Sequence, residues 1–305
     1  MKLKGYLLAA IAAATYGTNP AFAVPLYEQG MNPNSVLLFR YMMGLPVLAA
    51  MLIWRGHPIA LQQREIMPLA VLGLLMGTSS LTLFEAYNYM NSGVASTLLF
   101  VYPVMVALLM TFFFHEHFRA TTGICLALTG AGLIMLLRTP EGSEISVTGI
   151  ALVMISSLTY AIYLVMTNVS KTVRGIPTLK LLFWQLVFGS SVFIFVIAIG
   201  SPLTLPSQSS GWLNLAALAL LPTIISLGCT TAAIHSIGST PTALFGALEP
   251  VTAVALSVAV LNQAITVREL AGGLLIVAAT TLVVAADPVD KVLLRMRKMF
   301  PKLRK

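Results

Sequence analysis

One carboxylic acid stands in the middle of a long apolar segment. Glu249 is the sole charged residue between Thr240 and Leu261, a stretch long enough to cross a bilayer, and Pro250 follows it directly. An acid at the centre of a membrane helix costs about 2.5–3.5 kcal/mol to insert, so such residues face protein or a water-filled cavity. Pro250 frees a backbone carbonyl that can line a site. Glu249 is therefore a candidate for binding a proton or a substrate ammonium group; the alternative is a protonated acid hydrogen-bonded between helices.

Three further residues combine polar chemistry with depth in the membrane. Tyr102 also precedes a proline near the middle of an apolar segment, and it serves equally well as a substrate contact or as a packed aromatic residue. Arg40 and Glu85 lie at matching depths from the outer ends of their segments, given a rise of about 1.5 Å per residue. The sequence thus predicts an Arg40–Glu85 salt bridge, which could be an outer gate, a carboxylate-binding arginine or a static ion pair.

An aromatic and amide-bearing set completes the candidate site: Tyr16, Asn19, Tyr89, Tyr160, Tyr163, Trp184 and Gln185. Tyr16 and Asn19 lie one helical turn apart, and Tyr160 and Tyr163 repeat that spacing. Such residues can line a cavity that holds an amine by cation–π contact. For any single member the simpler interpretation is helix packing, whereas the set as a whole favours a cavity.

The sequence gives little support for a metal site or for enzyme chemistry. The stretch "HEH" at 115–117 has no further ligand cluster beside it and is not an HExxH motif. No nucleophile motif accompanies the histidines, so a membrane enzyme is a minor alternative and no cofactor is expected. Cys125 and Cys229 lie in apolar segments, where cysteine behaves as a small hydrophobic residue.

Composition defines the surroundings of these residues. The 305-residue chain is 58% hydrophobic and 9% charged, against about 25% charged residues in soluble domains, so it is an integral membrane protein. The net charge of +8 invites a nucleic-acid interpretation, but seven of the 18 Lys and Arg lie after Asp290. Basic residues beside membrane helices set topology and attract anionic lipid; we therefore expect contact with the bilayer and no nucleic-acid partner.

The apolar runs predict an all-α protein with ten transmembrane helices: 5–27, 35–54, 67–90, 93–114, 120–138, 148–169, 177–200, 212–236, 239–261 and 268–286. With the N-terminus inside, fifteen Lys and Arg fall on the inner side and two on the outer side. This asymmetry predicts that both termini are cytoplasmic. The basic tail, 287–305, is either an amphipathic surface helix or a solvated segment.

The two halves of the chain resemble each other. At an offset of 144, Thr15-Tyr16 matches Thr159-Tyr160, and at an offset of 147, Tyr102-Pro103 matches Glu249-Pro250. The sequence therefore predicts two five-helix repeats, 1–139 and 147–286, which run through the membrane in opposite senses because five is odd. Inverted repeats are typical of secondary transporters with a site near the midplane; a passive scaffold left by gene duplication is the alternative.

Four stretches carry a family resemblance: "GVASTLLFVYPVMVALLMTFFFHEHF", "GICLALTGAGLIML", "TPTALFGALEPVTAVALSVAVLNQAIT" and "AGGLLIVAATTLVV". They resemble the closing helices of the two repeats in ten-helix EamA-type members of the drug/metabolite transporter superfamily. Glu116 occupies the family's Glu at a helix end, where we expect a structural role. The second copy departs from the pattern, with Gln263 in place of that Glu and Asn262 before it.

The resemblance implies an inner-membrane carrier, often an exporter, of amino acids or other small metabolites, with no prosthetic group. Its central cavity is expected among the first, third, fourth, sixth, eighth and ninth helices. We thus expect a secondary transporter of small polar metabolites, amino acids or amines first, that works by alternating access with proton coupling through Glu249. An uncoupled facilitator remains the main alternative, and both a monomer and a homodimer are compatible with the sequence.

Overall fold

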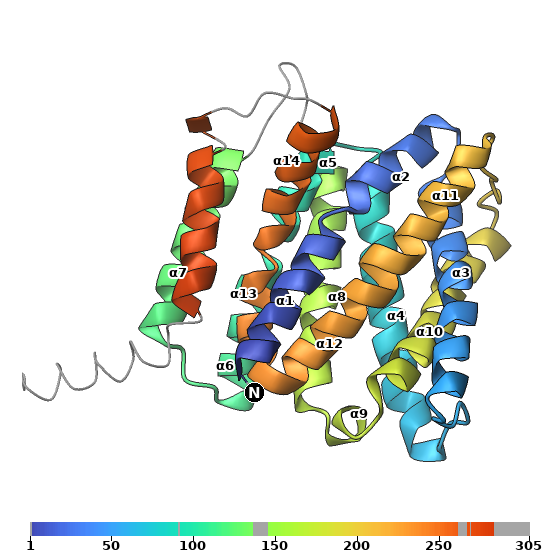
Figure 1. Ribbon diagram of the computed structural model, residues 1–305, viewed down its shortest axis with the longest axis horizontal. Helices are drawn as coiled ribbons and strands as arrows, with labels where there is room; N and C mark the ends of the chain where they lie inside the picture. Colours follow the sequence, from blue (N-terminus) through green and yellow to red (C-terminus); the bar gives the residue numbers. More distant parts are fainter. Residues whose placement is uncertain (1, 91, 137–145, 262–266, 269, 284–305) are drawn as a thin grey trace, which may run out of the picture.

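The computed structural model describes residues 2–90, 92–136, 146–261, 267–268 and 270–283. All regular structure in these ranges is helical (Figure 1). The helices are α1 Lys2–Tyr16, α2 Asn19–Glu28, α3 Pro33–Trp54, α4 Gln63–Ala86, α5 Ser92–Leu99, α6 Tyr102–Phe114, α7 Ala120–Leu136, α8 Val147–Val169, α9 Lys171–Arg174, α10 Thr178–Ala198, α11 Ser209–Leu218, η1 Ala219–Ile225, α12 Ser226–Ile237, α13 Ser239–Phe245 and α14 Leu248–Leu261. An apolar helix, Leu270–Val283, follows. The predicted basic tail, 287–305, lies outside the described residues.

Six helical segments are long and apolar enough to cross a bilayer: Lys2–Glu28, Pro33–Trp54, Gln63–Ala86, Val147–Val169, Thr178–Ala198 and Ser209–Ile237. Shorter apolar helices lie between and after them. Large apolar side chains cover the outside of the bundle; Phe112 and Phe113, for example, are 71% and 72% exposed. Because water would penalise such a surface, the chain is a multi-pass membrane protein.

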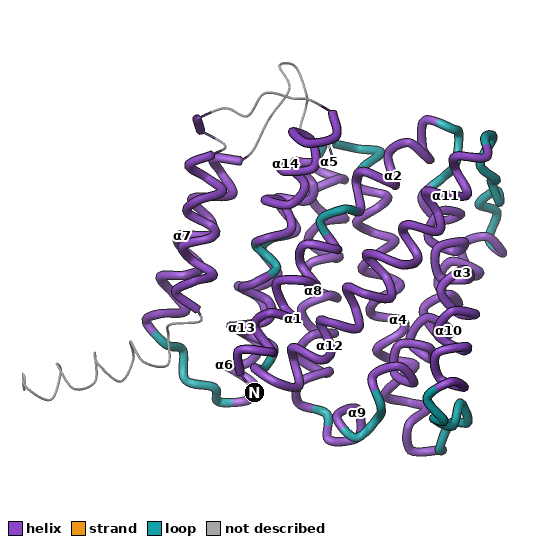
Figure 2. Tube along the Cα trace, in the orientation of Figure 1, coloured by secondary structure: helices purple, strands orange, loops and turns teal. Residues whose placement is uncertain are grey.

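Three of the predicted continuous helices are broken near their middles, contrary to the prediction. Two-residue turns fall at 17–18, 100–101 and 246–247, shortly before the pairs Asn19-Pro20, Tyr102-Pro103 and Glu249-Pro250. Figure 2 draws these turns in teal. Proline has no backbone N–H to donate and is tolerated in the first turn of a helix, so each pair begins a new helix.

The predicted helix 212–236 contains a further irregularity. Residues Ala219–Ile225 form a π-helical turn, η1, with Pro222 inside it, between α11 and α12. A single π-helical turn inserted in an α-helix is frequent at functional sites. Its polar groups are used by a neighbouring helix, as described below.

Helices from the two halves of the chain interleave. Helix α4 packs along α8, and the corresponding pair from the opposite halves, α12 and α1, packs in the same way. Helices α3 and α10 pack against each other at the far side of the bundle from α7 (Figure 1). Between α4 and α8, Ser79 and Ser156 exchange hydrogen bonds, with Ser156 Oγ 2.7 Å from the Ser79 carbonyl oxygen. The bundle is thus held together mainly by contacts between halves.

A buried ion pair joins α4 to α10 near one end of the bundle. Lys180 Nζ lies 2.7 Å from Glu65 Oε2, and both side chains are almost fully enclosed. Glu65 also accepts a hydrogen bond from the backbone N–H of Gln62, which completes a capping box at the start of α4. Oε2 of this carboxylate thus accepts from both a cation and a backbone N–H, and a buried charge requires such partners.

Candidate functional site

The three helix breaks meet around Glu249. A Cβ atom on Gly17 would lie 2.4 Å from the Glu249 carbonyl oxygen, so the α1–α2 break touches the start of α14 directly. A Cβ atom on Gly246 would lie 1.6 Å from Tyr102 Oη, so the α13–α14 break touches the start of α6. Both approaches are open to glycine because it has no side chain. The repeat mates Tyr102 and Glu249 thus lie at equivalent breaks that contact each other.

Four tyrosines from three helices, Tyr16 of α1, Tyr102 of α6, and Tyr160 and Tyr163 of α8, gather at the same place; we call them the tyrosine cluster. The ring centroids of Tyr102 and Tyr160 are 4.9 Å apart and the rings meet edge to face. Tyr160 also stacks on Tyr16 at 6.5 Å and on Tyr163 at 5.9 Å. These distances are those of favourable aromatic pairs. The four tyrosine rings therefore pack together, and their role in binding substrate stays a prediction.

Two small cavities flank Glu249, which is half-buried and lines both. The first, the α12-side cavity, measures about 10 Å³ and includes Tyr102, Tyr160 and Gly246 with Ser226 and Thr230 of α12. The second, the Asn19-side cavity, measures about 30 Å³ and includes Tyr16, Asn19, Tyr87 and Ser96. Both are water-sized spaces. Glu249 therefore borders two small spaces that lie beside the helix breaks.

Arg40 is fully buried and bound to groups that the sequence did not indicate. Its Nη1 donates to Asn19 Oδ1 at 3.0 Å, its Nη2 donates to the Pro222 carbonyl at 3.3 Å, and its Nε donates to Thr223 Oγ1. The guanidinium also lies over the Phe84 ring, 5.9 Å from its centroid. The π-helical turn supplies two of these acceptors, which accounts for its place in the fold.

The predicted Arg40–Glu85 salt bridge is wrong. Glu85 is half-buried and accepts a hydrogen bond from Asn88 Nδ2 at 3.1 Å instead. The prediction considered only depth along the helices, whereas successive residues of a helix point about 100° apart. Phe84 faces Arg40, and Glu85 consequently faces elsewhere.

Three other predicted residues have separate positions. Trp184 Nε1 donates to the Ile59 carbonyl at 2.7 Å and thereby ties α10 to the loop after α3. Tyr89 lies in the turn after α4 and is 48% exposed. Neither lines the cavities beside Glu249. Gln185 is fully buried and accepts a long hydrogen bond, 3.5 Å, from Tyr163, so it adjoins the tyrosine cluster.

Sequence reasoning missed the polar residues of the eighth predicted helix. Ser226 and Thr230 line the α12-side cavity, and Thr223 binds Arg40. Their spacing of three and four residues places them on one helix face. That pattern of hydroxyl groups inside an apolar run is the signal from which they could have been found.

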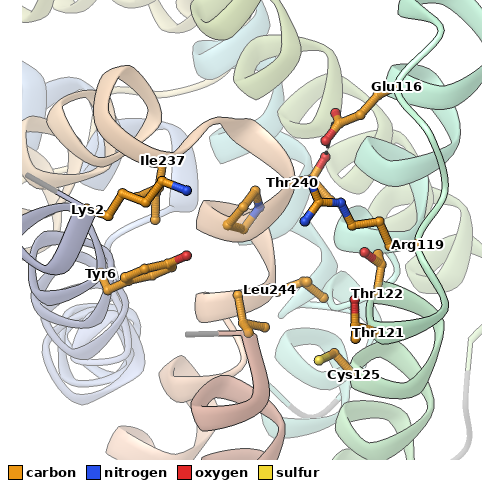
Figure 3. A pocket seen from close by; sticks show the side chains of 12 residues that line it. Lys2, Tyr6, Glu116, Arg119, Thr121, Thr122, Cys125, Ile237, Thr240 and Leu244 are labelled. Atoms are coloured by element: carbon orange, nitrogen blue, oxygen red, sulfur yellow. Dashed lines mark hydrogen bonds between the residues drawn. The ribbon is translucent and has the colours of Figure 1, made fainter. Parts of the chain in front are cut away.

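A larger pocket, which we call the end pocket, opens beside the start of α1 (Figure 3). Its volume is about 190 Å³, and Lys2, Tyr6, Glu116, Arg119, Thr240 and Leu244 are among its lining residues. Glu116 Oε2 accepts a hydrogen bond from Thr240 Oγ1 at 3.3 Å, which links the α6–α7 loop to α13. Within the described residues, no cluster of three His, Cys, Asp or Glu could hold a metal ion.

The short helix α13 separates the end pocket from the α12-side cavity. Thr240 and Leu244 line the pocket, whereas Thr242 and Ala243 of the same helix line the cavity. Tyr6 of α1 stacks on Phe245 at a centroid distance of 5.6 Å, beside this boundary. A movement of α13 away from α1 would connect the two spaces.

A half-buried acid among broken membrane helices is the arrangement of a membrane transporter rather than an enzyme. The chain belongs to the EamA-like transporter family, whose model matches residues 3–138 and again 147–285. An uncharacterized transporter of Bacillus subtilis, YdfC, is 24% identical over 254 residues, which are 82% of this chain and 81% of that protein. An uncharacterized transporter of Archaeoglobus fulgidus is 26% identical over 170 residues, 53% of this chain and 56% of that protein.

The fold is shared with a protein of known crystal structure. The two chains superpose with a TM-score of 0.76 at 20% sequence identity. The match covers 91% of this chain and 95% of the other. The likeness concerns the fold. The family match makes the chain a transporter that moves a small molecule across a lipid bilayer.

Proposed function

We propose that the chain is a secondary transporter of small polar metabolites in the inner membrane, with amino acids or amines as first candidates and export as the direction. The observation that carries this proposal is the position of Glu249 between two cavities at the meeting point of three helix breaks. Discontinuous helices near the midplane form the substrate sites of many transporters. A site flanked by closed spaces on both sides suits alternating access.

The proposed topology is ten membrane spans in two inverted repeats, 1–139 and 147–286, with both termini in the cytoplasm. The matching α4–α8 and α12–α1 packing supports an inverted repeat, as do the equivalent helix breaks at Tyr102 and Glu249. The excess of Lys and Arg in the connections on the side of the N-terminus supports the orientation.

We assign the coupling of proton movement to substrate transport to Glu249. Among the described residues its carboxyl group has no hydrogen-bond or ion-pair partner, and it borders both cavities. A carboxyl group in that position can take a proton from one side and release it to the other. It can equally pair with a substrate ammonium group, so that proton and substrate compete for one site.

The inner gate of the proposed cycle is the contact of Tyr6 with Phe245 at α13. Lys2, Tyr6, Ala9 and Ala13 follow one face of α1 at spacings of three and four residues, from the end pocket to the α12-side cavity. Movement of α13 would open this face to the cytoplasm. In the proposed cycle, the Thr240–Glu116 hydrogen bond holds the cytoplasmic end of α13 in the closed position.

The replacement Phe245→Ala is expected to open the gate. In a Cys125→Ala/Cys229→Ala background, a cysteine at Ala243 reports access to the α12-side cavity. Without the Tyr6–Phe245 contact, labelling by a membrane-impermeant thiol reagent from the cytoplasmic side is expected to rise about tenfold, which corresponds to about 1.4 kcal/mol in the opening equilibrium. The matched control is Phe195→Ala on the lipid-facing side of α10, where the ring is 64% exposed. Equal labelling with and without Phe245 would refute the gate.

Transport in proteoliposomes tests the function. The purified protein is reconstituted, and uptake of labelled amino acids and amines is measured with and without an imposed pH gradient. Accumulation above equilibrium that follows the gradient is the expected result. Uptake that stops at equilibrium would replace coupled transport by facilitation, and absence of uptake across both compound classes would refute the substrate class.

A further inference from the structure

The orientation of the Asn19 amide group is fixed by Arg40. An arginine side chain has donors and no acceptor, so the Asn19 atom that meets Arg40 Nη1 at 3.0 Å must be the carbonyl oxygen Oδ1. The amide nitrogen Nδ2 therefore points away from the guanidinium. Asn19 is 2% exposed, and within the described residues its Nδ2 has no hydrogen-bond partner. A buried donor without a partner is costly and calls for an explanation.

Asn19 shares a cavity with Glu249. Both residues line the Asn19-side cavity, together with the aromatic side chains of Tyr16 and Tyr87. The cavity thus combines an amide donor with a carboxyl group, which are the partners of opposite ends of a zwitterion. Glu249 can accept from an ammonium group, and Asn19 Nδ2 can donate to a carboxylate.

Arg40 makes the Asn19 amide a stronger hydrogen-bond donor to an anionic group. It is fully buried, and its described partners are the neutral oxygen atoms of Asn19, Thr223 and Pro222. No acid balances its charge within the described residues. An uncompensated cation behind the amide favours an anionic group on the far side of that amide, since charges interact strongly away from water.

We propose that Asn19 is a specificity-determining residue that donates a hydrogen bond to the carboxylate of an α-amino acid whose ammonium group lies at Glu249, and that Arg40 positions the amide. The inference rests on the proposed function, and it narrows the substrate class from amino acids or amines to amino acids. The cavity must widen to admit the ligand, because about 30 Å³ holds only water. Loss of a hydrogen bond to a charged group weakens binding by about tenfold to hundredfold.

The test compares amino acids with the amines that result from loss of their carboxylate: leucine with isoamylamine, phenylalanine with phenethylamine, and lysine with cadaverine. KM is measured in proteoliposomes for the wild-type protein, Asn19→Asp, Asn19→Ala and Arg40→Gln. Asn19→Asp has the same shape and can still accept from Arg40, but it presents an oxygen where the donor was. Thermal unfolding of each variant is recorded separately.

The wild-type protein is expected to prefer the amino acid of a pair. Asn19→Asp and Asn19→Ala should raise the KM of the amino acid about tenfold to hundredfold and leave that of the amine nearly unchanged. Arg40→Gln should lower the same preference, an effect that a purely structural arginine would not have. Ser191→Ala, at an exposed hydroxyl group bonded within its own helix, is the control.

Two results would overturn the inference alone: equal KM values for both members of a pair in the wild-type protein, or an equal rise for both in the Asn19 variants. Either result would leave transport of small polar metabolites in place. Absence of wild-type uptake for all six compounds would instead refute the proposed function, and the inference with it.

Discussion

Replacement of Glu249 by glutamine is expected to abolish substrate accumulation driven by a pH gradient while exchange of substrate down its own gradient continues. If one proton is exchanged for each substrate, a gradient of one pH unit sustains a substrate ratio of about ten, because each is worth about 1.4 kcal/mol. Glutamine keeps the shape and one acceptor oxygen for a substrate ammonium group but cannot bind and release a proton. The ratio should therefore fall from about ten to about one, as measured by uptake of labelled substrate into proteoliposomes.

The matched control for this variant is Glu28→Gln, at an exposed acid that ends α2. It removes one carboxylate from the chain without touching either cavity. Thermal unfolding and substrate exchange show whether Glu249→Gln is folded. A folded Glu249→Gln protein that still accumulates substrate about tenfold would remove Glu249 from the coupling mechanism.

The substitution Gly246→Ala is expected to have the second large effect, on both stability and transport. A methyl group there would lie 1.6 Å from Tyr102 Oη and 2.9 Å from Tyr102 Cζ. Gly246→Ala therefore forces the tyrosine ring away or pushes α13 and α6 apart. Overpacking of this kind costs about 1–3 kcal/mol, and occasionally more. We expect a lower unfolding temperature in detergent and a loss of most transport activity, because the break beside Glu249 can no longer close.

A second substitution makes this prediction specific. Tyr102→Phe removes the hydroxyl group that the new methyl group would meet, so the double variant Gly246→Ala/Tyr102→Phe should recover much of the lost unfolding temperature. Gly130→Ala in α7 is the control, since a Cβ atom there has no neighbour within 4 Å. Failure of Tyr102→Phe to improve the Gly246→Ala protein would show that the two residues are not in contact in the membrane.

Many residues of the candidate site could be identified from the sequence, but the way in which they pack could not. The offset aligns Tyr102-Pro103 with Glu249-Pro250, and in the structure each of these pairs lies at the start of a helix after a break. A proline shows where a helix can be interrupted. Whether the interruption becomes a kink or a turn depends on the packing around it, as with Gly17 against Glu249. A local sequence pattern does not predict that packing.

Arg40 illustrates a second limit. Depth along a helix can be predicted from residue number, and the predicted Arg40–Glu85 pair rested on depth alone. Direction around the helix and the identity of distant neighbours depend on how whole helices pack. Two of the three acceptors of Arg40 come from a π-helical turn about 180 positions further along the chain, and no spacing rule connects them to Arg40. Trp184 was misplaced for the same reason, since its partner is a backbone carbonyl in the loop after α3.

The small size of the two cavities beside Glu249 has a consequence for measured affinity. Spaces of about 10 and 30 Å³ are far below the volumes of about 300–1,000 Å³ that small-molecule sites occupy. This conformer is therefore closed to ligand, and the apparent dissociation constant equals the intrinsic constant divided by the fraction of molecules that are open. Substitutions that loosen the closed form, such as Phe245→Ala, should tighten apparent binding without adding any contact to the ligand. A weak wild-type affinity would thus measure the rarity of the open form rather than a poor fit between ligand and site.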